Sequence, residues 1–227
     1  MINNVQPFNL QFIVISENLK KIKATIPIGV TLVAVSKTKP NEAIMEAYKA
    51  GQRVFGENKV QDLVLKADLL PKDIQWHMIG HLQTNKVKFI APFVSLIHGV
   101  DSVKLLKEID KRAAQNERVI DCLLQIHIAK EETKFGFDES EAQELLTNLS
   151  GLNNVRIVGL MGMATNTSEE FQVRKEFAGL KELAIKLRTE NCKLQTISMG
   201  MSGDYLLAVK EGSTMVRVGS AIFGSRK

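Results

Sequence analysis

Short apolar segments alternate with helix-like segments eight times along this chain, and that alternation limits the folds open to it. The apolar segments predict strands at residues 31–35, 53–55, 74–79, 94–98, 119–128, 155–161, 194–198 and 215–218. Helical spacing predicts helices at residues 7–23, 42–50, 59–70, 83–90, 103–116, 138–149, 168–191 and 204–210. Most of the strands are apolar throughout, as parallel strands are when helices cover the sheet. The pattern predicts an α/β fold, a (β/α)8 or TIM barrel, with an extra N-terminal helix packed outside it.

An open doubly wound sheet would also alternate strands with helices. Such sheets often carry a Gly-x-Gly-x-x-Gly turn after the first strand, and no such motif follows residues 31–35. No shift in composition, Pro/Gly-rich linker or low-complexity segment divides the 227 residues. We therefore expect one barrel domain over residues 1–227.

The charge pattern restricts the partners. The net charge is +5, but the basic residues are spread along the chain without a run of five or more like charges. A nucleic-acid-binding arm is therefore not expected, whereas small anions such as phosphates suit the sign of the charge.

The cysteines and the N-terminus indicate the cytoplasm. Cys122 and Cys192 lack the spacing of metal ligands and do not suggest a disulfide framework. The first ten residues lack the features of a secretory signal, and no apolar run approaches the about 20 residues that span a bilayer. We expect a cytoplasmic protein that does not enter a membrane.

A lysine at the end of the first predicted strand is the first candidate for chemistry. The apolar residues 31–35 lead into Ser36 and Lys37, and Pro40 suits the first turn of the next helix. Burying an ammonium costs on the order of several kcal/mol unless it is paired or neutralised. Because a desolvated lysine stays nucleophilic, an imine between Lys37 and a carbonyl compound would remove that charge. The alternative is that Lys37 extends from the strand end into solvent.

The loops after the last two strands of such a barrel often hold phosphate. Ser198-Met-Gly-Met-Ser202-Gly-Asp204 leads from the seventh predicted strand straight into a helix, so its small residues expose backbone N–H groups. Ser202 adds a hydroxyl, and Gly219-Ser220 supplies further N–H groups after the eighth strand. We predict a phosphate site here; the alternative is two turns that need glycine for their backbone.

Arg217 lies at the end of an apolar strand, where a buried guanidinium needs an acceptor. It has the parity of Met215, so both side chains face one side of the strand. It would either pair with Glu57 or Asp204, or face a pyridine nitrogen. In the second case its charge would keep that nitrogen unprotonated and weaken the ring as an electron sink.

Two residues after other strands complete the candidate pocket. Asn58 is either a helix cap or, beside Lys37, a hydrogen-bond donor to a phenolate oxygen. Met163 either belongs to the core or lines the pocket.

Two histidines, His77 and His81, do not assemble a metal site, because no further ligands stand at suitable spacing. We interpret both as hydrogen-bonded groups. A Ser/His/Asp set and paired carboxylates at successive strand ends are also missing, so hydrolase functions have little support.

Several motifs resemble those of the pyridoxal-phosphate homeostasis protein family (the YggS/PROSC family), in order and spacing, over nearly the whole chain. They are Val33-Ala-Val-Ser-Lys37-Thr, Phe55-Gly-Glu-Asn58, Trp76-His-Met-Ile-Gly80-His-Leu-Gln-Thr-Asn-Lys86, Gly159-Leu-Met-Gly-Met163, Ser198-Met-Gly-Met-Ser202-Gly-Asp204 and Val216-Arg-Val-Gly219-Ser-Ala-Ile-Phe-Gly224. The family has the barrel that forms the N-terminal domain of alanine racemases. The resemblance therefore implies an alanine racemase N-terminal-domain-like fold.

The resemblance also implies pyridoxal 5′-phosphate (PLP) as the cofactor, held as a Schiff base on Lys37. By the same likeness, Ser202, Gly219 and Ser220 would hold the phosphate, and Arg217 would face the pyridine nitrogen. Two further residues are implied near the ring and at the pocket rim, Asn58 and Lys134 respectively.

The family is thought to buffer and deliver PLP, which implies a role in vitamin B6 homeostasis with little or no turnover. Racemases of this fold add a β domain with an opposing catalytic residue, and this chain is expected to lack one. A two-base racemase needs acid/base groups on both faces of the Cα, and the nearby candidates besides Lys37 are Lys39, His81 and Lys134. The only tyrosines, Tyr48 and Tyr205, lie inside predicted helices.

We therefore expect a PLP carrier that is a monomer and passes PLP to apo-enzymes. A weak PLP-dependent amino-acid racemase is the alternative. Neither nucleic acid nor a metal ion is expected as a partner.

Overall fold

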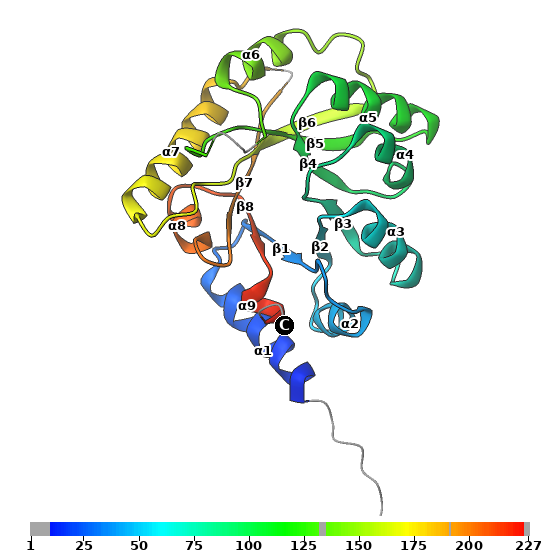
Figure 1. Ribbon diagram of the computed structural model, residues 1–227, viewed down its shortest axis with the longest axis vertical. Helices are drawn as coiled ribbons and strands as arrows, with labels where there is room; N and C mark the ends of the chain where they lie inside the picture. Colours follow the sequence, from blue (N-terminus) through cyan, green and yellow to red (C-terminus); the bar gives the residue numbers. More distant parts are fainter. Residues whose placement is uncertain (1–9, 132–134, 191, 225–227) are drawn as a thin grey trace, which may run out of the picture.

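The computed structural model describes residues 10–131, 135–190 and 192–224, with the side chains of residues 10–13 left aside. Eight parallel strands close into one barrel in sequence order, and helices surround it (Figure 1). The strands are β1 Thr31–Val35, β2 Val54–Glu57, β3 Gln75–Met78, β4 Leu96–Val100, β5 Ile120–Gln125, β6 Val155–Met161, β7 Thr196–Met201 and β8 Met215–Val218. The predicted (β/α)8 barrel is confirmed.

Most helices follow a strand and lie on the outside of the barrel (Figure 1). Their bounds are α2 Asn41–Lys49, α3 Val60–Leu69, η1 Thr84–Lys86, α4 Val87–Ile90, α5 Val103–Gln115, α6 Glu139–Thr147, α7 Glu170–Lys186, α8 Tyr205–Lys210 and α9 Ser220–Phe223. Among the described residues, no helix is both long and apolar enough to cross a membrane.

The extra N-terminal helix is α1, Leu10–Thr25, and it packs outside the barrel beside α2 and α9 (Figure 1). The Ser16 amide donates to Glu46 Oε1 on α2 at 3.2 Å. Asn18 Nδ2 donates to the Ile222 carbonyl oxygen on α9 at 3.2 Å. Residues 7–9 of the predicted helix lie outside the described residues.

The core has two layers because successive side chains of a strand point to opposite faces. Leu32 and Ala34 point outward into the large apolar layer between strands and helices, whereas Val33 points into the barrel. Val33 is in register with Arg217 of β8, and Met215 shares the interior cluster with Val33. Arg217 therefore points into the barrel with Met215, as its parity predicts.

Strand β7 continues past its predicted end at Ser198 to Met201. Its register against β8 shifts between Ser198 and Met201, and Gly200 has a φ of +93° within the strand. A Cβ at Gly200 would lie 2.5 Å from the Cβ of Ala208, so only glycine lets α8 pack this closely. Gly200, which suggests a loop in the sequence, belongs to a bulged strand instead.

Helix α9 is a second difference from the prediction, which placed no helix after the eighth strand. It has only four residues, Ser220–Phe223, too few for apolar periodicity to reveal. It places the backbone N–H groups after β8 at the opening of a helical turn.

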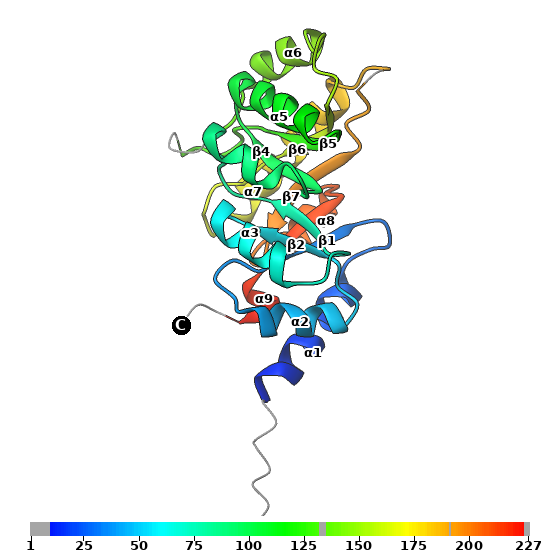
Figure 2. The ribbon, with the colours of Figure 1, turned by 90° about the vertical axis from the view of Figure 1, so that its right-hand side faces the viewer.

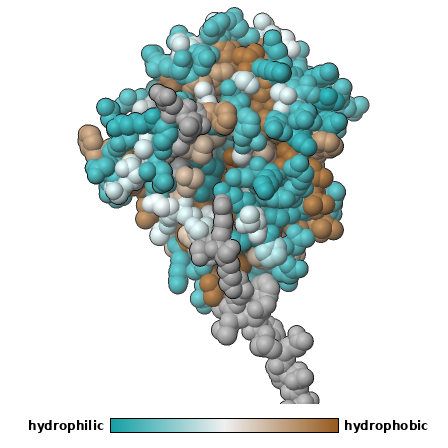
Figure 3. All heavy atoms as spheres, in the orientation of Figure 1, coloured by the Kyte–Doolittle hydropathy of each residue, from teal (hydrophilic) through white to brown (hydrophobic). Residues whose placement is uncertain are grey.

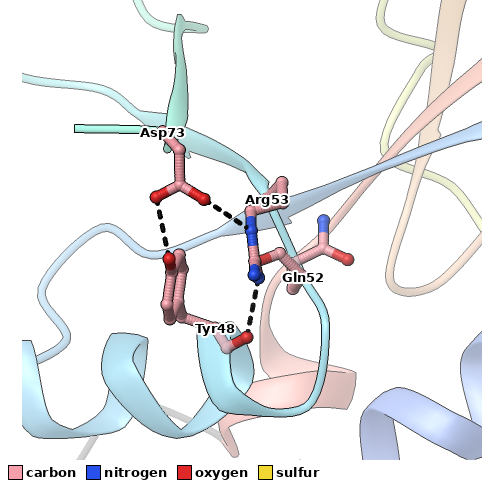
Figure 4. A network of polar contacts seen from close by, with 4 residues as sticks. All are labelled: Tyr48, Gln52, Arg53 and Asp73. Atoms are coloured by element: carbon pink, nitrogen blue, oxygen red, sulfur yellow. Dashed lines mark hydrogen bonds and ion pairs between the residues drawn. The ribbon is translucent and has the colours of Figure 1, made fainter. Parts of the chain in front are cut away.

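Polar residues hold the amino end of β2 in place (Figure 4). Asp73 accepts from the Tyr48 hydroxyl at 2.8 Å and from Arg53 Nε at 2.9 Å, and Arg53 also donates to the Tyr48 carbonyl oxygen. The buried Gln52 donates to the carbonyl oxygens of Leu32 and Val54. Tyr48 therefore stabilises the amino end of β2 from outside the barrel.

The two ends of the barrel are distinct in the side view (Figure 2). Helix α9, which follows β8, lies to the left, and the connection from α1 to β1 lies to the right. Figures 1 and 3 look onto the carboxyl ends of the strands, and the surface seen there is mostly hydrophilic with small hydrophobic patches.

Candidate functional site

A cavity of about 380 Å³ opens at the carboxyl ends of the strands. All seven residues predicted for the site line it, namely Lys37, Asn58, Met163, Ser202, Arg217, Gly219 and Ser220. The cavity is also lined by Lys39, one of the acid/base candidates, and by residues that were not predicted near the site. The seven further lining residues in the described parts of the chain are Val35, Thr38, Lys39, Ile79, Met201, Gly203 and Gly224. Five of these seven lie within two residues of a predicted site residue, so proximity to a strand end is the signal that could have found them.

The charge of this cavity is one-sided. Its described lining includes three cationic side chains, Lys37, Lys39 and Arg217, and no acidic one. Hydroxyls and backbone N–H groups add further donors. The cavity is therefore suited to an anionic ligand of small size.

Lys37 is presented by a tight turn directly after β1. The Lys39 amide donates to the Ser36 carbonyl oxygen at 3.0 Å, and Thr38 has a φ of +64°. A positive φ at the third position belongs to a type II turn, where glycine is usual and a β-branched residue is strained. Lys37 is half-buried and lies at the second position of this turn. Local strain of this kind is found at functional sites.

A buried ion pair supports this turn from below. Lys66 Nζ, on α3, lies 2.6 Å from Glu57 Oε1 and 2.9 Å from the Ser36 carbonyl oxygen. The Ser36 hydroxyl donates to the same Glu57 oxygen at 2.6 Å. Glu57 is fully buried, and its Oε2 has no hydrogen-bond partner among the described residues. Glu57 therefore pairs with Lys66 rather than with Arg217.

The close approach of a glycine positions Asn58. A Cβ at Gly80, after β3, would lie 2.4 Å from the Asn58 carbonyl oxygen and 2.8 Å from its Cα. Only glycine permits the backbones to approach so closely. Lys59, not Asn58, is the N-cap residue of α3, so the capping alternative for Asn58 is wrong. Its side chain remains in the cavity lining.

Ser202 ties the two predicted phosphate loops together. Its Oγ accepts from the Gly219 amide at 3.1 Å and from the Ala221 amide at 3.5 Å. The hydroxyl proton of Ser202 is left to donate to another acceptor. Gly219 also lies against β1, since a Cβ there would be 3.2 Å from the Val35 carbonyl oxygen.

Arg217 is held from inside the barrel. Its Nη1 donates to the carbonyl oxygen of Ser198 at 2.8 Å and to the hydroxyl of Ser198 at 2.6 Å, and Nη2 donates to the Gly162 carbonyl oxygen at 3.1 Å. Burial lowers the pKa of Arg217 to about 10, and the nearby Asp204 carboxylate opposes that shift. The guanidinium therefore stays charged at neutral pH. Asp204 itself accepts from the Met201 amide at 2.5 Å.

The predicted histidines are hydrogen-bonded. His77 Nδ1 lies 3.0 Å from His98 Nε2 inside the barrel. His81 is at the rim, where its Nδ1 lies 2.9 Å from Asp101 Oδ2 and its ring stacks on Phe135. Within the described parts of the chain, no group of three or more His, Cys, Asp or Glu residues is placed to hold a metal ion.

The acid/base candidates of the racemase alternative are placed as follows. Lys39 Nζ donates to the carbonyl oxygens of Phe223 at 3.1 Å and Gly224 at 3.0 Å. His81 is not part of the described cavity lining, and Lys134 lies outside the described residues. The Tyr205 hydroxyl lies 3.0 Å from that of Thr25 on α1, away from the cavity.

Comparison with known proteins points to one family. The chain matches the alanine racemase N-terminal domain over residues 13–227. The pyridoxal phosphate homeostasis protein of Aquifex aeolicus (strain VF5) is 43% identical to it over 198 residues, which cover 86% of this chain and 87% of that protein.

Solved structures agree with this match. PipY of Synechococcus elongatus PCC7942 has been solved without PLP (TM-score 0.88, 39% identity) and with PLP bound (TM-score 0.85, 38% identity), in both cases over 92% of this chain and 100% of PipY. Alanine racemase from Bartonella henselae has a TM-score of 0.74 at 17% identity, over 95% of this chain and 61% of that enzyme. The similarity to alanine racemase is one of fold alone.

Proposed function

The chain belongs to the pyridoxal phosphate homeostasis protein family, and on that premise we propose that it binds PLP reversibly and buffers or delivers it, with little or no turnover. The observation that carries the proposal is the position of Lys37. It lies on a strained turn at the mouth of a barrel, in a cavity with cationic and donor groups and no acidic group among its described residues. When bound, PLP supplies an aldehyde that a lysine amine can hold as a Schiff base.

The cavity fits the phosphate of PLP. Ser202 Oγ accepts hydrogen bonds from two backbone N–H groups, so its hydroxyl proton can donate to a phosphate oxygen. The Ser220 amide begins the turn of α9, and Gly219 leaves no side chain between that turn and β1. Ser202, Gly219 and Ser220 would therefore hold the phosphate. A volume of about 380 Å³ is in the range of small-ligand sites.

Three residues are suited to the pyridine ring. Asn58 would donate to the phenolate oxygen, and Met163 would lie against the ring as an apolar contact. Arg217 lines the cavity, and three of its five N–H groups donate inside the barrel, so two remain to donate to a ligand. A charged donor at the ring nitrogen would keep that nitrogen unprotonated.

The same contacts favour low turnover. An unprotonated pyridine is a weak electron sink, so Arg217 would disfavour removal of a proton from a bound amino acid. Racemisation also needs an acid/base group on each face of the Cα. Lys39 is the lining lysine besides Lys37 in the described residues, and its Nζ donates to two carbonyl oxygens.

The racemase alternative depends on Lys39, since this lysine does line the cavity. It would have to leave the Phe223 and Gly224 carbonyl oxygens and act as a base. Exchange of the α-proton of L-alanine for deuterium, followed by NMR, separates the two functions. A carrier shows no exchange above the rate of free PLP, whereas a racemase shows exchange that a Lys39→Met variant loses.

Delivery to apo-enzymes completes the proposal. A half-buried lysine at the barrel mouth can exchange its PLP without opening the core. We propose that recipient enzymes take PLP from this mouth, and that the protein acts as a cytoplasmic monomer.

The first experiment is the absorption spectrum of the purified protein with PLP, before and after borohydride reduction. The modified peptide is then identified by mass spectrometry. We expect a visible band that borohydride removes and a reduced adduct on Lys37. A protein that stays colourless with added PLP, or an adduct on another lysine, would contradict the proposal.

A further inference from the structure

A continuous chain of hydrogen bonds crosses the interior of the barrel. His77 Nδ1 lies 3.0 Å from His98 Nε2, and His98 Nδ1 lies 3.1 Å from Ser198 Oγ. Ser198 Oγ in turn accepts from Arg217 Nη1 at 2.6 Å. The chain thus links four strands, β3, β4, β7 and β8, and ends at the residue proposed to face the pyridine nitrogen.

The chain connects two cavities. Arg217 lines the cavity at the carboxyl ends of the strands, and His77 lines a second cavity of about 630 Å³ at their amino ends. His98 and Ser198 between them have no exposed surface, and His77 is 5% exposed. These hydrogen-bonded side chains therefore take positions in the barrel interior that branched apolar side chains usually fill.

The donors and acceptors can be assigned from one end. An arginine only donates, so Ser198 Oγ is an acceptor for Arg217. The remaining partner of that Oγ among the described residues is His98 Nδ1, so the hydroxyl proton points there and Nδ1 accepts it. His98 must then carry its proton on Nε2 and donate to His77 Nδ1. His77 in turn carries its proton on Nε2.

The opposite direction leaves a proton without an acceptor. If His77 Nδ1 donated to His98 and His98 Nδ1 donated to Ser198, the Ser198 hydroxyl would receive two donors. Its own proton would then have no acceptor among the described residues. A buried hydroxyl in that state costs about 1–3 kcal/mol in general, so the first direction is preferred. Burial also lowers the pKa of His77 to about 3 and that of His98 well below its ordinary value, so both rings are neutral at pH 7.

We propose that Ser198, His98 and His77 are positioning residues that hold Arg217 toward the ring nitrogen of bound PLP through this one-way chain. The inference rests on the proposed function for the role of Arg217. It assigns new roles to two histidines outside the cofactor cavity. All hydrogen bonds of this chain run in one direction. Each residue accepts a hydrogen bond from the side of Arg217 and donates one toward the amino end of the barrel, and the last donor is His77 Nε2–H.

The first test does not need PLP. Protein labelled with ¹⁵N-histidine is prepared free of PLP, and long-range ¹H–¹⁵N NMR identifies the protonated nitrogen of each ring. We expect Nε2–H and unprotonated Nδ1 for both His77 and His98. A proton on Nδ1 of either ring would overturn the assigned direction, whether or not the protein binds PLP.

The second test measures the effect on the cofactor. PLP labelled with ¹⁵N in the ring is bound to wild type, His98→Leu, His98→Asn and Ser198→Ala, and the ring ¹⁵N shift and PLP dissociation rate are recorded. Ser198→Ala loses the hydroxyl that accepts from the charged Arg217, which predicts about tenfold faster dissociation and a displaced ring ¹⁵N resonance. His98→Leu removes the acceptor of the Ser198 proton and should displace the ring ¹⁵N resonance in the same direction. His98→Asn, whose amide oxygen can accept from Ser198, should restore much of the wild-type shift.

A control separates positioning from packing. Met161→Leu changes a buried interior side chain of similar volume that is outside the chain of hydrogen bonds. It should leave the ring ¹⁵N shift unchanged. Should His98→Leu fail to fold, Ser198→Ala carries the test, because it removes a single hydroxyl. Wild-type ¹⁵N shifts in both His98→Leu and Ser198→Ala would overturn the positioning role, whereas absence of PLP binding in wild type would instead overturn the proposed function.

Discussion

The two ends of the barrel each carry a cavity, and the cavities differ in charge. The carboxyl-end cavity has Lys37, Lys39 and Arg217 in its described lining and no acidic residue. The amino-end cavity is larger, about 630 Å³ against about 380 Å³, and its lining mixes both signs. There Arg156 Nε lies 2.7 Å from Asp121 Oδ1, and Glu190 and Lys193 add one charge of each sign.

The larger cavity is therefore not the better candidate for the ligand site, because the charges of the lining matter more than the volume. Charges of opposite sign in one cavity satisfy each other, so the amino-end cavity has little net attraction for an ion. Cations without acidic neighbours attract an anionic ligand. Backbone strain does not distinguish the two ends, since Thr38 has a φ of +64° at the carboxyl end and Leu194, which lines the amino-end cavity, has a φ of +41°.

The largest expected effect is the loss of covalent PLP in Lys37→Ala. If the carboxyl end alone is functional, this variant should form no borohydride-reducible adduct, because the amine is gone. Lys193→Ala, at the other cavity, is the matched control and should behave as wild type. Circular dichroism should show the same fold in all three proteins. A reducible adduct in Lys37→Ala would mean that PLP is held by a residue other than Lys37.

The interior between the two ends should make stability depend on pH. His77 has a pKa of about 3 when folded, below its ordinary value of 6.5, so the unfolded chain binds more protons as the pH falls. Its contribution is present above pH 6.5 and is lost progressively from there toward pH 3, by up to about 1.4 kcal/mol per pH unit. His98 is lowered for the same reason and adds to the slope.

Urea denaturation between pH 6.5 and 5 measures this slope before most carboxylates titrate. His77→Asn should flatten it, whereas Met161→Leu, which changes a buried interior side chain that does not titrate, should leave it as in wild type. An unchanged slope in His77→Asn would show that this ring takes up its proton at the same pH in the folded protein as in the unfolded chain.

Beneath the carboxyl end, Lys66→Met should cost about 3–5 kcal/mol of unfolding free energy, because it leaves the carboxylate of Glu57 buried without its cation. The Glu57 side chain is 0% exposed and that of Lys66 is 10% exposed. The double variant Glu57→Gln, Lys66→Met should recover part of the loss. Urea denaturation measures both, and equal stability of Lys66→Met and wild type would mean that the pair does not support the turn of Lys37.

Ser202→Ala should weaken PLP retention by about 1.5–3 kcal/mol, the usual contribution of a hydrogen bond to a charged group. Equilibrium dialysis of PLP against wild type measures the change. Thr196→Val removes a hydroxyl from a residue that lines the amino-end cavity and should leave the affinity within about twofold. Equal affinities for Ser202→Ala and wild type would argue against the phosphate role.

Much of the fold could be predicted because the buried strands are short continuous apolar segments of the sequence. The bounds of β1, β6 and β8 agree with the predicted ranges 31–35, 155–161 and 215–218. The prediction ended β7 too early because Gly200 lies in a bulge rather than a turn. Helix α9 was missed because a single turn has no periodicity.

The candidate site was predictable to the extent that it follows strand ends. Parallel strands bring their carboxyl ends together, so Lys37 and Arg217 had to share one end of the barrel once the fold was known. The Glu57–Lys66 pair and the place of His98 depend on side-chain packing between elements. Nothing in the local sequence states which residue of α3 reaches β2, or that His98 points inward toward Ser198.

The smallest expected effect is at the amino end, in Arg156→Ala. The side chains of Arg156 and Asp121 are 67% and 28% exposed, so water and salt screen their attraction. Removing the pair should cost about 0.2–1 kcal/mol of unfolding free energy, less at 1 M salt, and should leave PLP affinity unchanged. Urea denaturation at low and high salt, with PLP dialysis alongside, measures both quantities. If Arg156→Ala instead weakened PLP binding severalfold, the mixed-charge cavity would be coupled to the cofactor site. The hydrogen-bond chain from His77 to Arg217 would then be the path to examine, because it joins the two cavities through the barrel interior.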